Sequence, residues 1–173
     1  MRKHSPMSMF FKSVSEVVDQ EQLVHNDTGY IGNAAGVTVF GAQSFKLSGE
    51  KTFTAIEGWC PGIGGSFSGD ATTTIETDDS GKPSGILVNV NATKTWTPAV
   101  GIIKTIFDVP FVLSGGTTYW IVIRCGAQTM GNYGLNMINN KGGYANGHMS
   151  AYYMGSWHDA PTSSLYFKLY VQA

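Results

Sequence analysis

The feature that most constrains the fold of this chain is an alternation of side chains with period two, which recurs from about residue 37 to the end. In the segment 119–125, YWIVIRC, both the odd-numbered and the even-numbered residues are largely apolar. Successive side chains of a strand point to opposite faces of a sheet. This segment is therefore expected to be a central strand that is covered on both sides or that faces a partner surface.

Other segments with strand character follow the same rule. We expect further strands at 37–47, 52–59, 71–77, 86–91, 102–113, 149–157 and 165–171. Those at 86–91 and 165–171 alternate apolar with polar residues, which predicts strands with one wet face. Clusters rich in Gly, Pro, Ser, Asn and Asp separate the strands, at 47–50, 61–69, 78–85, 114–116 and 139–147.

No crossover helix is available between these segments, so parallel pairing is excluded and antiparallel pairing is expected. The 22 glycines and the many Ser, Thr and Asn residues suit short strands joined by turns. We therefore predict an all-β fold, an antiparallel β-sandwich of jelly-roll topology with eight or more strands.

The one stretch with helical spacing lies near the start, where Phe10, Val14, Val17 and Val18 could share a face. A strand or an extended arm running through Val24 fits this stretch equally well. The sequence leaves these alternatives open.

The length of 173 residues is typical of one domain. We expect residues 1–12 to form an N-terminal arm and residues 13–173 to form a single β-sandwich (jelly-roll) domain. The arm residues expected to make assembly contacts with a neighbouring protein are Arg2, Lys3, Phe10 and Phe11.

Charge narrows the classes of partner. Only 13% of the residues are charged, against about 25% in an average soluble domain. The chain has 11 Lys and Arg residues and 12 Asp and Glu residues, so the two signs nearly balance. Nucleic-acid binding draws on a basic patch, so we expect no nucleic-acid partner. No run approaches the roughly 20 apolar residues that span a bilayer, so we expect no membrane insertion.

The first residues, MRKHSPMSMFFKSVSE, lack the apolar core of a secretory signal. We expect a cytosolic start. If the protein acts outside cells, it would leave them by another route, such as assembly into a virus particle that is released on lysis.

Catalytic signatures are missing. The glycine-rich segment PGIGGSFSG at 61–69 matches neither the dinucleotide spacing nor the phosphate loop, and it lacks the elbow that exposes a nucleophilic serine. No pairing of carboxylates for acid and base catalysis can be detected. We therefore expect a connecting loop at 61–69, no cofactor and no enzymatic activity.

Metal binding has weak support. His4, His25, His148 and His158 fall at no spacing typical of zinc ligands. Asp78 and Asp79 could ligate Ca²⁺, but no full calcium loop surrounds them, and a turn capped by their side chains is the simpler interpretation. No metal site is predicted.

The two cysteines, Cys60 and Cys125, allow one disulfide bond. A single pair in a chain with an adequate core is no disulfide framework. Two buried thiols are the simpler interpretation.

Binding is the remaining class of function, and the region 132–157 is its best candidate. Tyrosines and a tryptophan alternate there with asparagines and glycines. Flat aromatic faces beside amide groups hold sugar rings or make adaptable protein contacts. The candidate ligand-binding residues are Tyr133, Tyr144, Asn146, Tyr152 and Trp157.

Core packing is the competing interpretation for the same aromatic residues. Core packing is favoured over ligand binding for Tyr153 and Trp157, which lie at strand positions. For Tyr133 and Tyr144 the two interpretations fit equally well. Trp59, Trp96 and Trp120 lie on strands or at strand ends, and for them a core position is favoured.

Several phrases resemble a jelly-roll β-sandwich module that occurs in bacterial and archaeal extracellular proteins and in phage and virus particles. They are DQEQ at 19–22, GAQSFKL at 41–47, IETDDSGKPSG at 75–85, LSGGTTYWIV at 113–122, GSW at 155–157 and LYFKLY at 165–170. Ser163 and Ser164 stand where such modules often carry an acidic residue, which weakens any metal or ligand role carried over to this end.

The resemblance implies similarity to carbohydrate-binding and galactose-binding-like domains, which serve as adhesive or structural appendages. We expect a non-enzymatic structural or attachment component of a virus particle, of a phage above all, as a capsid decoration or a tail- or fibre-associated protein. Its expected location is the virion, and its expected partners are other virion proteins and further copies of itself. The alternative is a carbohydrate-binding module that acts on a glycan at a cell surface or in the extracellular space.

Overall fold

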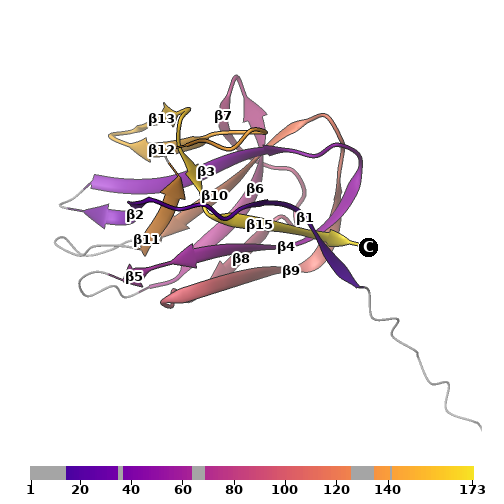
Figure 1. Ribbon diagram of the computed structural model, residues 1–173, viewed down its shortest axis with the longest axis horizontal. Helices are drawn as coiled ribbons and strands as arrows, with labels where there is room; N and C mark the ends of the chain where they lie inside the picture. Colours follow the sequence, from indigo (N-terminus) through magenta and orange to yellow (C-terminus); the bar gives the residue numbers. More distant parts are fainter. Residues whose placement is uncertain (1–14, 35–36, 64–68, 126–134, 141) are drawn as a thin grey trace, which may run out of the picture.

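The computed structural model describes residues 15–34, 37–63, 69–125, 135–140 and 142–173, which form an all-β sandwich-like fold of two antiparallel sheets (Figure 1). The predicted fold class is confirmed. The smaller sheet has four strands in the order β1 (Glu16–Gln22), β15 (Phe167–Gln172), β4 (Lys51–Cys60) and β9 (Gly101–Leu113).

The larger sheet curls around the molecule, and its curling is compatible with a jelly roll. Its main path runs through β14 (Ser164–Leu165), β11 (Leu135–Asn140), β2 (Asp27–Ala34), β3 (Val37–Lys46), β10 (Thr118–Cys125), β6 (Ala71–Asp79) and β7 (Lys82–Leu87). Four more strands attach to this path: β5 (Gly62–Ile63) to β11, β8 (Thr93–Trp96) to β6, and the hairpin of β12 (Met149–Tyr153) and β13 (Ser156–Ala160) to β3.

The main core lies between the two sheets. On β15, Phe167, Leu169 and Val171 alternate with less buried residues, so one face of the strand enters the core. Phe45 of β3 and Phe53 of β4 stack with ring centroids 6.0 Å apart and so join the two sheets.

Strand β10 is buried on both faces, as its sequence predicts. Tyr119, Ile121 and Ile123 enter the main core, while Trp120 and Val122 form a second, smaller cluster with Ala42. The Trp120 indole N–H donates a 2.7 Å hydrogen bond to Asp78. This second cluster explains why a strand in a sandwich carries apolar residues at consecutive positions.

The described part of the stretch with helical spacing is a strand, whereas Phe10 and Val14 lie outside the described residues. Val17 and Val18 lie in β1, which pairs antiparallel with β15, and Val17 faces Val171. Both valines are β-branched, which favours a strand, and β15 offers an edge for pairing. These two effects outweigh the weak helical spacing.

Three expected strands differ in extent from the observed ones. The strand expected at 165–171 is divided into β14 of the larger sheet and β15 of the smaller one. The strand expected at 86–91 ends at Leu87, because Asn89 accepts hydrogen bonds from the backbone N–H groups of Asn91 and Ala92 and so forms a turn. The strand expected at 149–157 is the β12–β13 hairpin, which turns at Met154 and Gly155 with φ of 52° and 85°.

The two cysteines are not joined by a disulfide bond. Cys60 of β4 and Cys125 of β10 are both buried in the main core. Cys60 Sγ lies 3.2 Å from the Gly62 carbonyl oxygen. The interpretation as two buried thiols is confirmed.

Among the described residues, no helix has the length and apolar character needed to cross a membrane.

Candidate functional site

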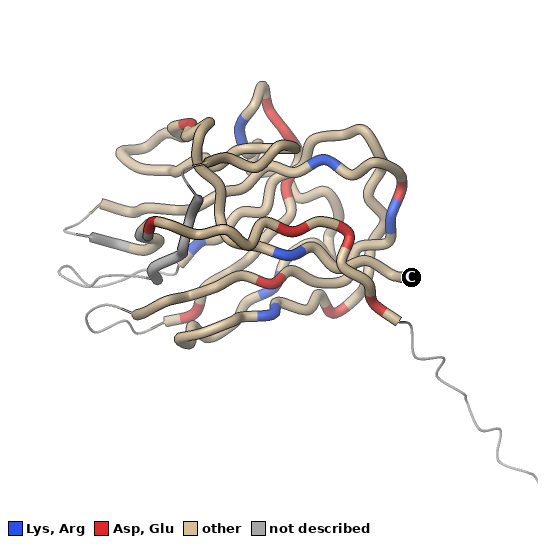
Figure 2. The backbone as a smooth tube through the Cα atoms, viewed as in Figure 1, with Lys and Arg blue, Asp and Glu red and all other residues tan. Residues whose placement is uncertain are grey.

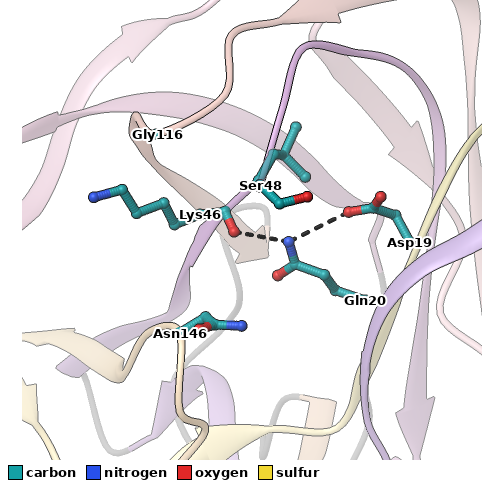
Figure 3. Close-up of a pocket in the computed structure, with 7 residues that line it drawn as sticks. Asp19, Gln20, Lys46, Ser48, Gly116 and Asn146 are labelled. Carbon is teal, nitrogen blue, oxygen red and sulfur yellow. Dashed lines mark hydrogen bonds between the residues drawn. The ribbon is translucent and has the colours of Figure 1, made fainter.

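A polar pocket of about 470 Å³ lies between β1, the end of β3 and the loop before β12 (Figure 3). Strand β1 contributes Asp19 and Gln20, and the end of β3 contributes Lys46. The turns that follow β3 and β9 and the loop before β12 complete the wall with Leu47, Ser48, Gly116 and Asn146. Five of these seven residues carry polar or charged side chains, so the pocket suits a hydroxylated ligand better than an apolar one.

The side chain of Gln20 organises the pocket. Its amide nitrogen donates hydrogen bonds to the Lys46 carbonyl oxygen at 2.7 Å and to the Asp19 carboxylate at 3.3 Å. Its amide oxygen accepts the hydroxyl proton of Tyr144. Figure 3 shows Asp19 and Gln20 entering from β1 and Asn146 approaching from the opposite side. Gln20 is thus fixed in one orientation before any ligand arrives.

Tyr144 does not line the pocket but holds one of its residues in place. Its ring packs edge-on against Phe167, with the centroids 5.1 Å apart, and its hydroxyl group is directed at Gln20. Burial raises the pKa of Tyr144, the negative charge of Asp19 adds to the rise, and a hydrogen bond with Asn146 opposes it. The ring faces the core, so Tyr144 offers its hydroxyl group and not a stacking surface.

The loop that carries Tyr144 and Asn146 is tied down at both ends. At the start, Gln22 of β1 donates a 3.3 Å hydrogen bond to the Gly143 carbonyl oxygen. At the end, the backbone N–H of His148 donates to Ser44 Oγ at 2.8 Å, and the Ser44 N–H donates to the His148 carbonyl at 2.9 Å. These links hold Asn146 at the pocket.

Glycines bring the opposite wall together. A Cβ atom on Gly115 would lie 2.4 Å from the Gly49 Cα, so the turn after β9 meets the turn after β3 at backbone contact. The N–H of Gly116 donates to the Leu47 carbonyl oxygen at 2.9 Å. This contact places Gly116 beside Ser48 and closes that side of the pocket.

Tyr152 and Trp157 form a different cluster on the β12–β13 hairpin. Their rings meet edge-on at 5.4 Å, and Tyr152 stacks on Phe40 at 5.3 Å. Trp157 packs against the second cluster, whereas Tyr144 packs against the main core. The core interpretation holds in part for Trp157, and the hairpin that carries it extends the larger sheet beside β3.

The candidate site residues from the sequence are thus divided by the structure. Tyr144 and Asn146 meet at the pocket, Tyr152 and Trp157 meet on the hairpin, and Tyr133 lies outside the described residues. The arm residues Arg2, Lys3, Phe10 and Phe11 also lie outside them.

Sequence reasoning missed most of the pocket wall, namely Asp19, Gln20, Lys46, Ser48 and Gly116. Lys46, Ser48 and Gly116 lie at a strand end or in turns, where polar side chains of different segments converge, whereas Asp19 and Gln20 lie inside β1 and carry no such signal. Gln20 and Lys46 are separated by 26 positions, and only the fold unites them.

A second surface feature lies along β9, at the edge of the smaller sheet. We define the β9 strip as Ile102, Ile106, Val109 and Val112, whose exposed fractions lie between 50% and 57%. A hollow of about 360 Å³ adjoins it, lined by residues that include Glu16, Ile106 and Pro110. Exposed apolar residues in a row on an edge strand are typical of an interaction surface.

Figure 2 shows charged residues spread along the strands, with both signs interspersed. Several carboxylates are bound to a lysine: Glu16 to Lys104 at 2.6 Å, Glu57 to Lys168 at 3.1 Å and Asp19 to Lys51 at 3.6 Å. Within the described part of the chain, no group of three or more His, Cys, Asp or Glu residues could hold a metal ion. Asp78 instead accepts a hydrogen bond from the N–H of Gly81, as a capped turn requires.

Comparison with protein-family models and with curated proteins finds no match to this chain.

Proposed function

We propose that the protein is a non-enzymatic structural and attachment component of a virus particle, in line with the phage modules that its sequence resembles. The observation that carries this proposal is the β9 strip, a row of apolar side chains on the free edge of the smaller sheet. A component that is built into a particle needs such a surface for its neighbours.

The ionised side chains agree with a non-enzymatic role. Glu16, Glu57 and Glu76 are each bound to a lysine or an arginine, as in side-chain pairs that support a fold. The pairs of Glu57 and Glu76 join neighbouring strands, and the pair of Glu16 joins the two edge strands of the smaller sheet, so all three support the sheets.

Particle association is the test. Lysates of cells that carry the gene are fractionated by density, and the particle band is analysed by mass spectrometry. The proposal expects the protein to sediment with particles and to remain there through a salt wash, because apolar contacts are not screened by salt. Recovery of the protein only in the soluble fractions would overturn it.

The polar pocket favours a second candidate function, the binding of a surface glycan. Asn146, Ser48 and Asp19 carry amide, hydroxyl and carboxylate groups and line one cavity together with Gln20. An attachment component with such a pocket would recognise hydroxyl groups of a sugar.

A glycan array with matched variants tests this second function. Asn146→Ala and Tyr144→Phe should abolish binding, since the first removes a group on the pocket and the second releases Gln20. Ser156→Ala, on the exposed β12–β13 hairpin, should leave binding unchanged. Absence of binding by the unaltered protein at millimolar sugar would contradict the glycan function and would leave the structural proposal intact.

A further inference from the structure

The edge of the smaller sheet at β9 has no strand partner among the described residues. From Gly101 to Ile106, β9 pairs with β4 in regular register on its other side. On the side away from β4, no described strand is hydrogen-bonded to this segment, so its outward backbone N–H and C=O groups could pair with a further strand. Strand β8 of the larger sheet also lies beside β9, where its Lys94 pairs with Asp108 at 2.5 Å, beyond the segment 101–106. Pro110 and the bulge before Phe111 end this regular segment.

We infer that this edge takes up residues 7–12 of a second copy of the chain as an added antiparallel or parallel strand. This inference rests on the proposed structural function, and it names the partner and the contact.

The sequence of residues 7–12, MSMFFK, has the pattern that an added strand needs. Met7, Met9 and Phe11 alternate with Ser8, Phe10 and Lys12, so an extended conformation places three apolar side chains on one face. That face would cover Ile102 and Ile106 of the β9 strip. Pairing of backbone groups gives affinity in such complexes, and alternate side chains give specificity.

Charge is balanced at this edge. Beside the β9 strip, the 78% exposed Asp108 is paired with Lys94 at 2.5 Å, and Glu16, which lines the adjoining hollow, is paired with Lys104 at 2.6 Å. Each acid already has a cation, so the contact with residues 7–12 depends on backbone pairing and on apolar side chains.

The short length of chain before β1 indicates that the added segment comes from a second copy and not from the same chain. Ser15 precedes β1, which forms the opposite edge of the sheet from β9. A strand added beyond β9 lies four strand spacings from β1, about 19 Å at about 4.8 Å each. The three residues from Lys12 to Ser15 span at most about 11 Å. Residues 7–12 of the same chain therefore cannot reach that edge, whereas those of a neighbour can.

Complementation between two variants of the full chain tests the inference. Phe11→Asp disables the donated segment, and Ile106→Asp disables the receiving edge. By analytical ultracentrifugation, each variant alone should show a dissociation constant for self-association raised at least about tenfold. An equimolar mixture should form dimers again, because each complex then joins one intact segment to one intact edge. Val90→Asp, at an exposed apolar residue outside β9, is the matched control and should associate like the unaltered chain.

Hydrogen exchange locates the contact. On association, the outward amides of 101–106 should exchange more slowly, while those of β1 keep their rates. A monomeric unaltered chain at all concentrations, a mixture that fails to associate, or protection elsewhere with β9 unchanged would each overturn the inference. A chain that sediments with particles yet stays monomeric in solution would overturn this inference alone and leave the proposed function standing.

Discussion

Arg124 of β10 lies 2.5 Å from the carboxylate of Glu76 on β6, although the Glu76 side chain is only 2% exposed. Thr74 lies between them and hydrogen-bonds both, donating to Glu76 at 2.7 Å and accepting from Arg124 at 2.9 Å. The second carboxylate oxygen accepts the N–H of Gly85 at 2.9 Å. A buried charge with this full set of partners holds β6, β7 and β10 together.

Removal of the arginine should therefore be costly. Arg124→Met leaves the Glu76 carboxylate buried without its cation, and we expect the free energy of unfolding in urea to fall by about 3 kcal/mol. Arg124→Met combined with Glu76→Gln should lose less than Arg124→Met alone, because no uncompensated charge remains. Lys94→Met, which breaks a pair with the exposed Asp108, is the control and should cost under about 1 kcal/mol. Equal losses for Arg124→Met and Lys94→Met would contradict this account.

The loop before β12 requires glycine at position 147, because there is no room for a side chain. A Cβ atom there would lie 2.0 Å from the Ser44 carbonyl oxygen, and backbone cannot move aside cheaply. Gly147→Ala should lower the free energy of unfolding by about 2–3 kcal/mol. Gly49→Ala is the matched control, since its Cβ would meet no atom within 4 Å, and it should change stability by under about 0.5 kcal/mol. Thermal unfolding followed by circular dichroism measures both, and a neutral Gly147→Ala would refute the close contact.

The strands that the sequence predicts well are those with a strong local pattern. Tyr119 and Trp120 begin an alternation in which both faces are apolar, and the structure provides a core for each face. The segment at 86–91 shows why alternation is not sufficient. Its valines fit a strand, but Asn89 forms local hydrogen bonds that end β7 at Leu87 and leave Val90 exposed.

The pocket was less predictable, for a physical reason. Asn146 was a candidate from its aromatic and amide neighbours, whereas Gln20 and Ser48 carry no local pattern that separates them from other surface residues. Their relation is set by strand pairing across the chain: β1 pairs with β15, and the loop before β12 is held by Ser44 of β3. The spacing of the aromatic residues in the sequence also does not show which of them meet. Tyr144 packs against the main core, whereas Trp157 packs against the second cluster.

The thiols should be unreactive in the folded protein. Cys60 and Cys125 are both buried, and neither is in a disulfide bond. We expect a thiol reagent such as dithionitrobenzoate to modify neither in native buffer and both in denaturant, because a thiol must be exposed and ionised to react. Modification of either thiol on the native protein within minutes, or of none after unfolding, would contradict the structure.

Acid should weaken the contact between β1 and β9. The hydrogen bond from Lys104 lowers the pKa of Glu16 below its ordinary value of 4.5, with burial opposing the change. The folded state therefore holds the proton less tightly than the unfolded state. The stabilisation is fully present above about pH 4.5 and is lost as the pH falls through the lower pKa of the folded state.

The size of this effect is limited by solvent, because the Glu16 side chain is about a third exposed, and we expect under about 1 kcal/mol. Lys104→Met should flatten the loss of stability below pH 4.5 when urea unfolding is measured across a pH series. Lys82→Met, at an exposed lysine of β7, is the control and should leave the pH profile unchanged. If both variants keep the full acid loss, the Glu16–Lys104 pair does not contribute to it, and the acid sensitivity must arise from other carboxylates.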